Sequence, residues 1–453
     1  MNRSTHRNRK LIYLGGIIAL LIPVVLLGMP ADADGDGGYI AELRQQEGLG
    51  EASLGEVDPA SSSMNLMLLG LRGIAANMLW LQADEQKEHK QFDELEQTVK
   101  AIIKLQPHYI NVWKFQSWNL AYNVSAEFDA IADRYYWIKK GMTFLDGGLA
   151  RNERAAELFH DRGDFVGKKL GMADEWRMFR RYFLIDPDVD RWKGGPDERV
   201  NPFSEDNYQV AKQFYEEANE TETRTDAIPQ KKMARALFRS YPARAQLDFA
   251  EAIQREGRFD QVDAIKAAWS LGRDIWANKY GREIFTHSIG GNVILNWTPE
   301  DIEQLAEAEE VPVEQKMYFT EQTRKMVNYD FWMKRSKLEA DDNMINARRL
   351  LFSGKRKLLD DSNLEGARED LIKGLTDLQT VIDEVEGGNM LLTEKEVMED
   401  AIKSIIMWEY IQRLLSEEMP EDFPLKQVWT APENQRAIDE QRENFRRRIG
   451  SET

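Results

Sequence analysis

The chain has 453 residues, of which 42% are hydrophobic and 30% charged, so it has the apolar material for one large or two medium folded units and not the composition of a disordered chain. It has no cysteine, which excludes disulfides, thiolate metal sites and cysteine nucleophiles. The formal net charge of −18 repels nucleic acid, which we therefore exclude as a partner.

The N-terminus predicts a membrane anchor. A basic flank, residues 1–10, precedes an uncharged apolar stretch from Leu11 to Met29, and a helix of these 19 residues is about 28 Å long, which matches the hydrocarbon core of a bilayer. Because a basic flank stays in the cytoplasm, we expect residues 11–29 to be a transmembrane signal anchor and the body to be extracytoplasmic. Export without cysteine indicates a bacterial envelope protein of the inner membrane. The alternative is a cleaved secretory signal, since Ala31-Asp32-Ala33 has the small-x-small pattern of a cleavage site.

Residues 30–63 are rich in Gly, Asp, Ser and Glu and predict a flexible acidic linker. The segment Asp32–Gly37 has the Asp-x-Asp-x-Asp-Gly spacing with which a calcium loop begins. The twelfth position of such a loop supplies a bidentate glutamate, but here it is Leu43, so a solvated spacer is the favoured interpretation. We predict no metal and no cofactor for the chain.

From Met64 onward, apolar residues recur at three- and four-residue spacing and alternating strand-like runs are almost absent, which predicts an all-α body. The helices come in pairs that share a small residue nine positions before an aromatic one: Ala83 and Phe92, Ala156 and Phe165, Ala250 and Phe259. A glycine stands two positions before the aromatic residue in the second and third pairs, at Gly163 and Gly257. A fourth pair, residues 329–359 and 364–386, keeps Ala367 early in its second helix.

These spacings resemble those of the tetratricopeptide repeat, in which the small residue lets two helices pack closely and the glycine and aromatic residue form the turn. The resemblance implies an irregular α-solenoid of helical hairpins over residues 64–386, followed by a helical extension at 387–453. The tripeptide Arg162-Gly163-Asp164 would then lie on a turn of the array.

Two segments interrupt the helical pattern. Residues 186–204 contain three prolines and a Gly-Gly pair, which forbid a continuous helix, and residues 286–298 break around Gly290-Gly291. Each is either a plain connection or a recognition loop.

Aromatic residues are densest between residues 109 and 137, where helix–helix core is the favoured interpretation. The alternative is that Trp113, Trp118, Asn119 and Asn123 bind a partner. Asn119 and Asn123 stand four apart on one predicted helix, a position from which repeat arrays hold a partner's backbone by amide hydrogen bonds. The stretch that begins at Trp118 also resembles bacterial membrane proteins of unknown role.

The sequence therefore predicts a membrane-tethered extracytoplasmic scaffold or adaptor that binds protein or peptide partners through a helical-repeat surface, and not an enzyme. It has no nucleophile elbow, phosphate-binding loop, dinucleotide fingerprint or zinc-binding helix motif. Two alternatives stay open. One is a polysaccharide-cleaving envelope enzyme with a helical superhelix, which needs a carboxyl group of raised pKa. The other is a permanent structural subunit of an envelope complex, which would expose a large apolar surface on its own.

Overall fold

The structure is a computed structural model that describes residues 72–287 and 289–450, together with isolated positions between 13 and 39. It is 73% helix and 2% strand, which confirms the predicted all-α class. No helix among the described residues is both long enough and apolar enough to cross a bilayer. Apart from those isolated positions, the predicted anchor at 11–29 and the linker at 30–63, with its calcium-like loop, lie outside the described residues.

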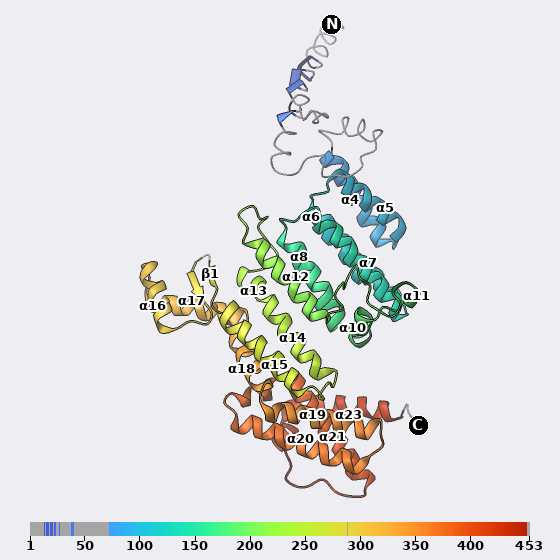
Figure 1. Cartoon of the computed structure of the whole chain (residues 1–453), viewed down its shortest axis with the longest axis vertical. Helices are drawn as coiled ribbons and strands as arrows, with labels where there is room; N and C mark the ends of the chain where they lie inside the picture. Colours follow the sequence, from blue (N-terminus) through green and yellow to red (C-terminus); the bar gives the residue numbers. More distant parts are fainter. Residues whose placement is uncertain are drawn as a thin grey trace, which may run out of the picture. The chain divides into compact units, whose positions relative to one another are not determined.

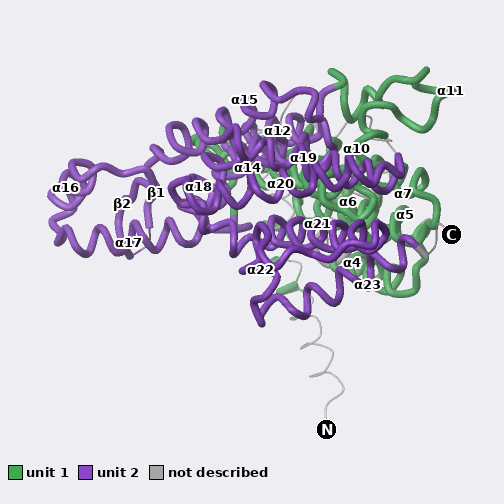
Figure 2. Tube along the Cα trace, turned by 90° about the horizontal axis from the view of Figure 1, so that it is seen from below, with its two compact units in different colours: residues 1–204, 220–230 green, residues 205–219, 231–453 purple. Residues whose placement is uncertain are grey.

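The chain divides into two compact units, which Figure 2 colours separately. Unit 1 comprises residues 1–204 and 220–230, and unit 2 comprises residues 205–219 and 231–453. The described helices of unit 1 are α4 (Arg72–Glu88), α5 (Phe92–Leu105), α6 (Ile110–Trp118), the π-helix η2 (Asn119–Val124), α7 (Ile131–Leu149), α8 (Ala156–Asp164), the π-helix η3 (Phe165–Lys169), α9 (Leu170–Met172), α10 (Trp176–Leu184) and α11 (Val189–Trp192).

The elements of unit 2 begin with α12 (Asn207–Glu222), most of whose residues belong to this unit. They continue with α13 (Arg235–Arg239), α14 (Tyr241–Arg255), α15 (Val262–Asp274), the π-helix η4 (Ile275–Tyr280), β1 (Ile284–His287), β2 (Gly291–Ile294), α16 (Pro299–Ala308), α17 (Val313–Met326) and α18 (Tyr329–Glu339). The last are α19 (Asp342–Leu359), α20 (Leu364–Glu384), the 3₁₀-helix η5 (Gly388–Thr393), α21 (Lys395–Leu414), α22 (Lys426–Thr430), the 3₁₀-helix η6 (Pro432–Asn434) and α23 (Gln435–Gly450).

Consecutive helices of unit 1 pack in pairs (Figure 1). In α5 a single stripe is fully buried, at Leu95, Val99 and Ile102, and it packs against α4. Ala83 of α4 is also fully buried, as the repeat spacing predicted. In the next pair, α6 and α7 approach closely because Gly148 has no side chain: a Cβ there would come within 2.9 Å of the Trp113 Cβ.

The second predicted turn is wrong. Helices α8, η3 and α9 run without a break from residue 156 to 172, so Gly163 and Phe165 lie inside a helix. Arg162 is buried, and its Nε donates a hydrogen bond of 2.8 Å to Asp146 Oδ1 of α7. Because apolar residues on both sides of Gly163 continue the buried face, tertiary packing keeps this glycine helical; the chain turns only after Met172.

The third predicted pair is confirmed, because α14 and α15 pack together across a turn at Gly257. Gly257 has φ +74°, and Ala250 and Phe259 are both buried. In the fourth pair α19 packs against α20, but the predicted first helix, residues 329–359, is two helices. They separate at Asp341, whose side chain accepts a hydrogen bond from the Asn343 N–H and so starts α19.

Gly257→Ala is expected to lower the free energy of unfolding of unit 2 by about 2–4 kcal/mol, since it strains the positive φ and drives a methyl group into the Phe352 ring. The new Cβ would lie 2.0 Å from Phe352 Cζ. Gly387→Ala is the matched control, because Gly387 has φ +83° but no atom nearer than 3.8 Å to its Cβ position. We expect Gly387→Ala to lower the free energy of unfolding by about 1–2 kcal/mol, which is the cost of a positive φ for a residue with a side chain. Equal midpoints for both variants in denaturant titrations would contradict the packing argument.

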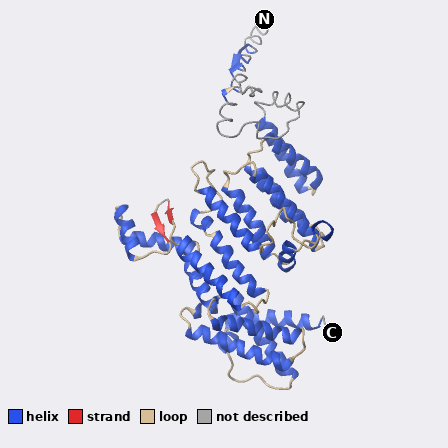
Figure 3. Cartoon of the chain, viewed as in Figure 1, coloured by secondary structure: helices blue, strands red, loops and turns tan. Residues whose placement is uncertain are grey.

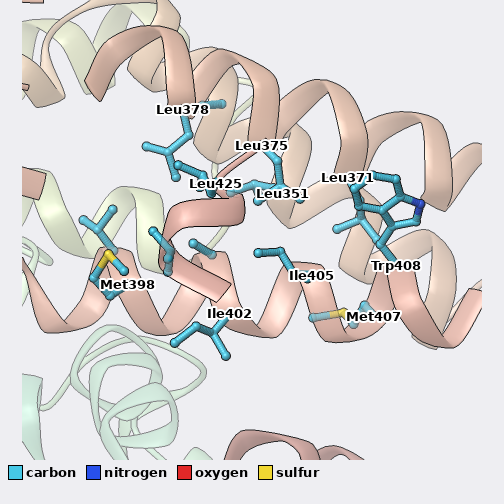
Figure 4. Close-up of a cluster of buried hydrophobic side chains, with 14 of the residues drawn as sticks. Leu351, Leu371, Leu375, Leu378, Met398, Ile402, Ile405, Met407, Trp408 and Leu425 are labelled. Atoms are coloured by element: carbon cyan, nitrogen blue, oxygen red, sulfur yellow. The ribbon is translucent and has the colours of Figure 1, made fainter. Parts of the chain in front are cut away.

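A large apolar core of unit 2 lies where α19, α20 and α21 meet (Figure 4). Leu371, Leu375 and Leu378 of α20 follow a four-then-three spacing that keeps them on one helix face. The side chains labelled in Figure 4 are Leu351, Leu371, Leu375, Leu378, Met398, Ile402, Ile405, Met407, Trp408 and Leu425.

The segment predicted as a second break, residues 286–298, overlaps the two strands of the described chain, an antiparallel hairpin that begins at Ile284 (Figure 3). Phe285 pairs with Val293, and both are buried. With α16 and α17 the hairpin forms an arm at one end of unit 2 (Figures 1 and 2). The sequence did not predict it, because each strand has only four residues, too few for an alternating pattern to stand out.

The predicted insert at residues 186–204 is largely irregular and contains only the short helix α11. A buried ion-pair group attaches it to α7. Lys139 Nζ of α7 pairs with Asp186 and, at 3.0 Å, with Asp197 Oδ2, and both carboxylates are fully buried. Burial would raise the pKa of Asp197, but hydrogen bonds from Arg199 and Lys139 outweigh it and hold that pKa below its usual value.

Candidate functional site

Two π-helical segments in unit 1, together with Trp118 at the end of α6, carry a group of aromatic residues. η2 continues α6 and η3 continues α8, and they meet where the Tyr122 and Phe165 rings lie 5.9 Å apart. Among the described residues there is one further π-helix, η4. Such segments are rare and occur often at functional sites, because they displace side chains from the regular helical register.

The most exposed ring of the group is Trp118, of which 46% is accessible. It stacks on Tyr122, with ring centroids 5.5 Å apart and planes 16° from parallel. Lys169 of η3 places its Nζ 4.6 Å from the centre of the Tyr122 ring, a cation–π contact. Burial lowers the pKa of Lys169, an effect that the nearby Glu175 opposes and Arg134 reinforces.

A second set of rings lies on α7 and, with Phe128, in the segment before it. Trp137 stacks on Phe128 at 5.7 Å, and Lys140 Nζ lies 4.8 Å from the Trp137 ring and 5.4 Å from the Tyr136 ring. Tyr136 is 50% exposed.

Arg134 connects the two sets. Its Nε donates to the Phe128 carbonyl, at 2.6 Å, and its guanidinium pairs with Glu175, whose charge acts on Lys169. We call the connected residues the aromatic surface: Trp118, Tyr122, Phe128, Arg134, Tyr136, Trp137, Lys140 and Lys169.

The aromatic surface has the chemistry of a protein-binding patch. Trp, Tyr and Arg are the residues that contribute most to binding energy in protein interfaces, because they bury a large apolar area and keep a polar group at the edge. The two lysines add positive charge to a chain that is otherwise strongly acidic. The arrangement therefore suits a partner that presents an apolar side chain next to an acidic one.

The four residues that the sequence predicts as a binding site differ in exposure in the structure. Trp118 is exposed, but Trp113 is 4% exposed and its Nε1 donates to the Pro107 carbonyl at 2.9 Å. Asn119 is fully buried and accepts a hydrogen bond of 2.9 Å from Asn123 Nδ2. The two amides thus bond to each other, and Asn119 Nδ2 is buried without a hydrogen-bond partner among the described residues.

Sequence reasoning did not include Lys140 and Lys169 in the site. Lys169 comes from a helix that follows Trp118 by about fifty residues, so only the fold brings its ammonium group to the Tyr122 ring. Tyr136 and Trp137 were visible as part of the aromatic-rich stretch, but spacing alone could not show which rings are exposed.

A histidine–carboxylate cluster lies on α8. Potential ligand atoms of His160, Asp161 and Asp164 are within 4.8 Å of one another. Two ammonium groups already balance these carboxylates: Lys168 pairs with Asp164 at 2.8 Å, and Lys114 of α6 lies 3.8 Å from Asp161. We interpret the cluster as an ion-pair network that joins α6 to α8.

A second charged cluster lies in unit 2 and includes a carboxyl group of raised pKa. Arg335 of α18 lies 3.1 Å from Glu251 of α14 and 3.2 Å from Glu396 of α21. Burial raises the pKa of Glu251 to about 7, although Arg335 lowers it and Glu396 raises it further. Next to it, Arg348 of α19 pairs with Glu339, whose side chain is fully buried.

A carboxyl group that titrates near neutral pH is what the enzyme alternative requires. Buried ion-pair networks shift pKa values in the same way, and Glu251 belongs to one that joins α14, α18, α19 and α21. We therefore take the aromatic surface as the first candidate site and Glu251 as the second.

Comparison with protein-family models, with curated proteins and with solved structures gives no match to this chain.

Proposed function

We propose that the chain is a scaffold or adaptor, tethered to a bacterial inner membrane by residues 11–29, whose extracytoplasmic body binds protein or peptide partners through the aromatic surface. The observation that carries the proposal is the half-exposed Trp118 ring, stacked on Tyr122 where two π-helical segments meet. A solvent-exposed tryptophan buries large apolar area when a partner covers it.

The proposed architecture is an irregular α-solenoid similar to tetratricopeptide-repeat proteins. The packed pairs α4–α5, α6–α7, α14–α15 and α19–α20 support it, as do the buried small residues Ala83, Ala250 and Ala367. Stacked pairs of this kind offer long surfaces for a partner chain. The tether would raise the effective concentration of the adaptor for partners near the membrane.

Trp118→Ala is expected to weaken partner binding about 30-fold, the effect of losing about 2 kcal/mol at an interface hot spot, and to leave the thermal unfolding midpoint nearly unchanged because the ring is exposed. The measurement is crosslinking in intact cells followed by quantitative mass spectrometry of what copurifies with the full chain. Tyr318→Ala is the control, since Tyr318 is 59% exposed on α17 of unit 2. Recovery of the same proteins with both variants would remove the aromatic surface as the binding site.

The raised pKa of Glu251 favours one rival, an envelope enzyme that uses this group as a general acid on a polysaccharide. Reducing-end release from cell-envelope polysaccharides distinguishes the two functions. An enzyme would lose activity in Glu251→Gln and keep it in Trp118→Ala. An adaptor would release no reducing ends and would lose its partners only in Trp118→Ala.

A further inference from the structure

The two outer edges of the β-hairpin in unit 2 differ. On the outer edge of β2, side chains form hydrogen bonds with the backbone groups that a neighbouring strand would otherwise pair. The Asn292 N–H donates to Glu309 Oε1 at 2.8 Å, and the Asn292 carbonyl accepts from Lys316 Nζ at 3.1 Å. Lys316 also donates to the Gly290 carbonyl, at 3.0 Å, and its side chain is fully buried. An ion pair of Lys316 and Glu309 therefore replaces the neighbouring strand that β2 lacks.

The outer edge of β1 has no such cover. Thr286 is paired with Asn292, and because the Asn292 backbone groups point away from β1, antiparallel geometry directs those of Thr286 away from β2. The same holds for Ile284, two residues earlier. No partner for these outward N–H and C=O groups occurs among the described residues; the Thr286 hydroxyl donates to Asn292 Oδ1.

The β1 edge also lacks the features that protect natural edge strands. Such edges usually carry lysine, proline or a bulge, which prevent another strand from pairing. Residues 284–298 contain no charged residue and no proline, although 30% of the chain is charged. Ile284 is 53% exposed at the start of the strand, and Ile289 is 78% exposed at the hairpin tip.

We propose that the β1 edge binds an extended segment of a partner protein, which adds to the hairpin as a third strand through backbone hydrogen bonds. Strand addition of this kind draws affinity from the main chain and specificity from alternate side chains. The exposed Ile284 favours apolar, β-branched residues in the added strand. This inference does not depend on the aromatic surface, which belongs to unit 1.

Charge and size decide between a partner segment and a second copy of the chain. Residues 281–330 contain ten acidic and four basic residues, so a second copy would bring a like-charged arm to the same edge. An uncharged strand with basic flanks is attracted instead. The edge is four residues long, which is far below the roughly 800 Å² per partner of a stable folded interface and suits a flexible segment.

The test uses the full chain and a fluorescein-labelled peptide of alternating valine and threonine with two lysines at each end, KKVTVTVKK. We expect saturable binding by fluorescence anisotropy. Thr286→Pro should weaken it at least about 10-fold, since it removes the outward N–H, and Thr286→Val should bind like the unaltered chain because it keeps that N–H. The hairpin should survive the proline, because the Thr286 N–H is not part of the β1–β2 ladder.

Amide hydrogen exchange provides the structural readout. In the free chain the Thr286 amide should exchange fast and the Asn292 amide slowly, and the peptide should slow Thr286, with Ile284 on the same edge, at least about 10-fold and leave Asn292 unchanged. If Thr286→Pro also exposed the Val293 amide, which faces β1 in the ladder, the hairpin would have opened. A peptide with N-methylated valines, tested on the unaltered chain, would then decide the question, and we expect it not to bind. Absence of saturable binding, or equal binding of the N-methylated peptide, would overturn the proposal. So would self-association in light scattering that Thr286→Pro abolishes, because it would assign the edge to a second copy.

Discussion

Lys139→Met is expected to destabilise the packing of residues 186–204 against α7 by about 3–5 kcal/mol, because it leaves two buried carboxylates without their shared cation. Asp186 and Asp197 are fully buried, and Lys139 is the group that lies between them. Arg199 still pairs with Asp197, at 2.6 Å, but its side chain is half-exposed and does not replace the lost charge at Asp186. The methionine fills most of the lysine volume, so the effect is electrostatic rather than a cavity.

Limited proteolysis and thermal unfolding measure this effect. We expect Lys139→Met to make residues 186–204 the first site of cleavage and to lower the unfolding midpoint, whereas Lys104→Met, at an exposed position of α5, should change neither. Adding Asp186→Asn and Asp197→Asn to Lys139→Met should recover part of the stability, since neutral amides are cheaper to bury than unpaired carboxylates. A Lys139→Met variant as resistant as the unaltered chain would show that the insert is held by other contacts.

The sequence predicted this segment as a break in the helices but could not predict how it is held. Pro and Gly residues at 186–204 forbid a continuous helix by local geometry, and a local rule is enough to place a break. The pairing of Lys139 with Asp186 and Asp197 spans 47 and 58 residues, so no local pattern contains it.

Gly163 and Gly257 show the same limit at the level of the turn. Both stand two residues before a phenylalanine, and the sequence predicted a turn at each. Gly257 does turn the chain, but Gly163 stays helical because its helix buries residues on both sides of it against α7 and α6. Local sequence gave equal signals, and tertiary packing decided between them.

The candidate site was predicted in part for a related reason. Aromatic density identified the right stretch of chain, and Trp118 is one of the exposed rings in it. Trp113, five residues away, is buried because Gly148 of α7 leaves room for its indole. The second helix decides which ring is covered, and a single helical stretch does not contain that information.

Glu251→Gln is expected to stabilise unit 2 above pH 7, by up to about 3 kcal/mol. The folded-state pKa of Glu251 is raised from 4.5 to about 7, chiefly by burial. Below pH 4.5 the carboxyl group is protonated in both states and contributes no difference. Between pH 4.5 and 7 the unfolded chain loses this proton first, so the folded state binds more protons and the free energy of unfolding falls as the pH rises.

Other carboxyl groups near Glu251 also make the free energy of unfolding depend on pH, so their contribution must be separated from that of Glu251. Burial raises the pKa values of Glu394 and Asp400 as well, while in Glu339 the paired Arg348 and Arg335 overcome burial and lower the pKa. The stabilisation by Glu339 is therefore fully present above its unfolded pKa of 4.5 and is lost only as the pH falls below that value. Because the other groups are present in both proteins, the difference between the unaltered chain and Glu251→Gln reports Glu251 together with its interactions with Arg335 and Glu396.

The measurement is the free energy of unfolding from denaturant titrations at pH 4.5, 6 and 8, with Glu303→Gln as the control because Glu303 is exposed on α16. We expect the Glu251→Gln curve to lie increasingly above that of the unaltered chain as the pH rises, and the Glu303→Gln curve to follow the unaltered one. A variant that loses stability at pH 8 would mean that the Arg335 pair outweighs the burial of the charge. Glu251 would then be ionised at neutral pH as the partner of Arg335. It would have no proton to donate and could not act as a general acid.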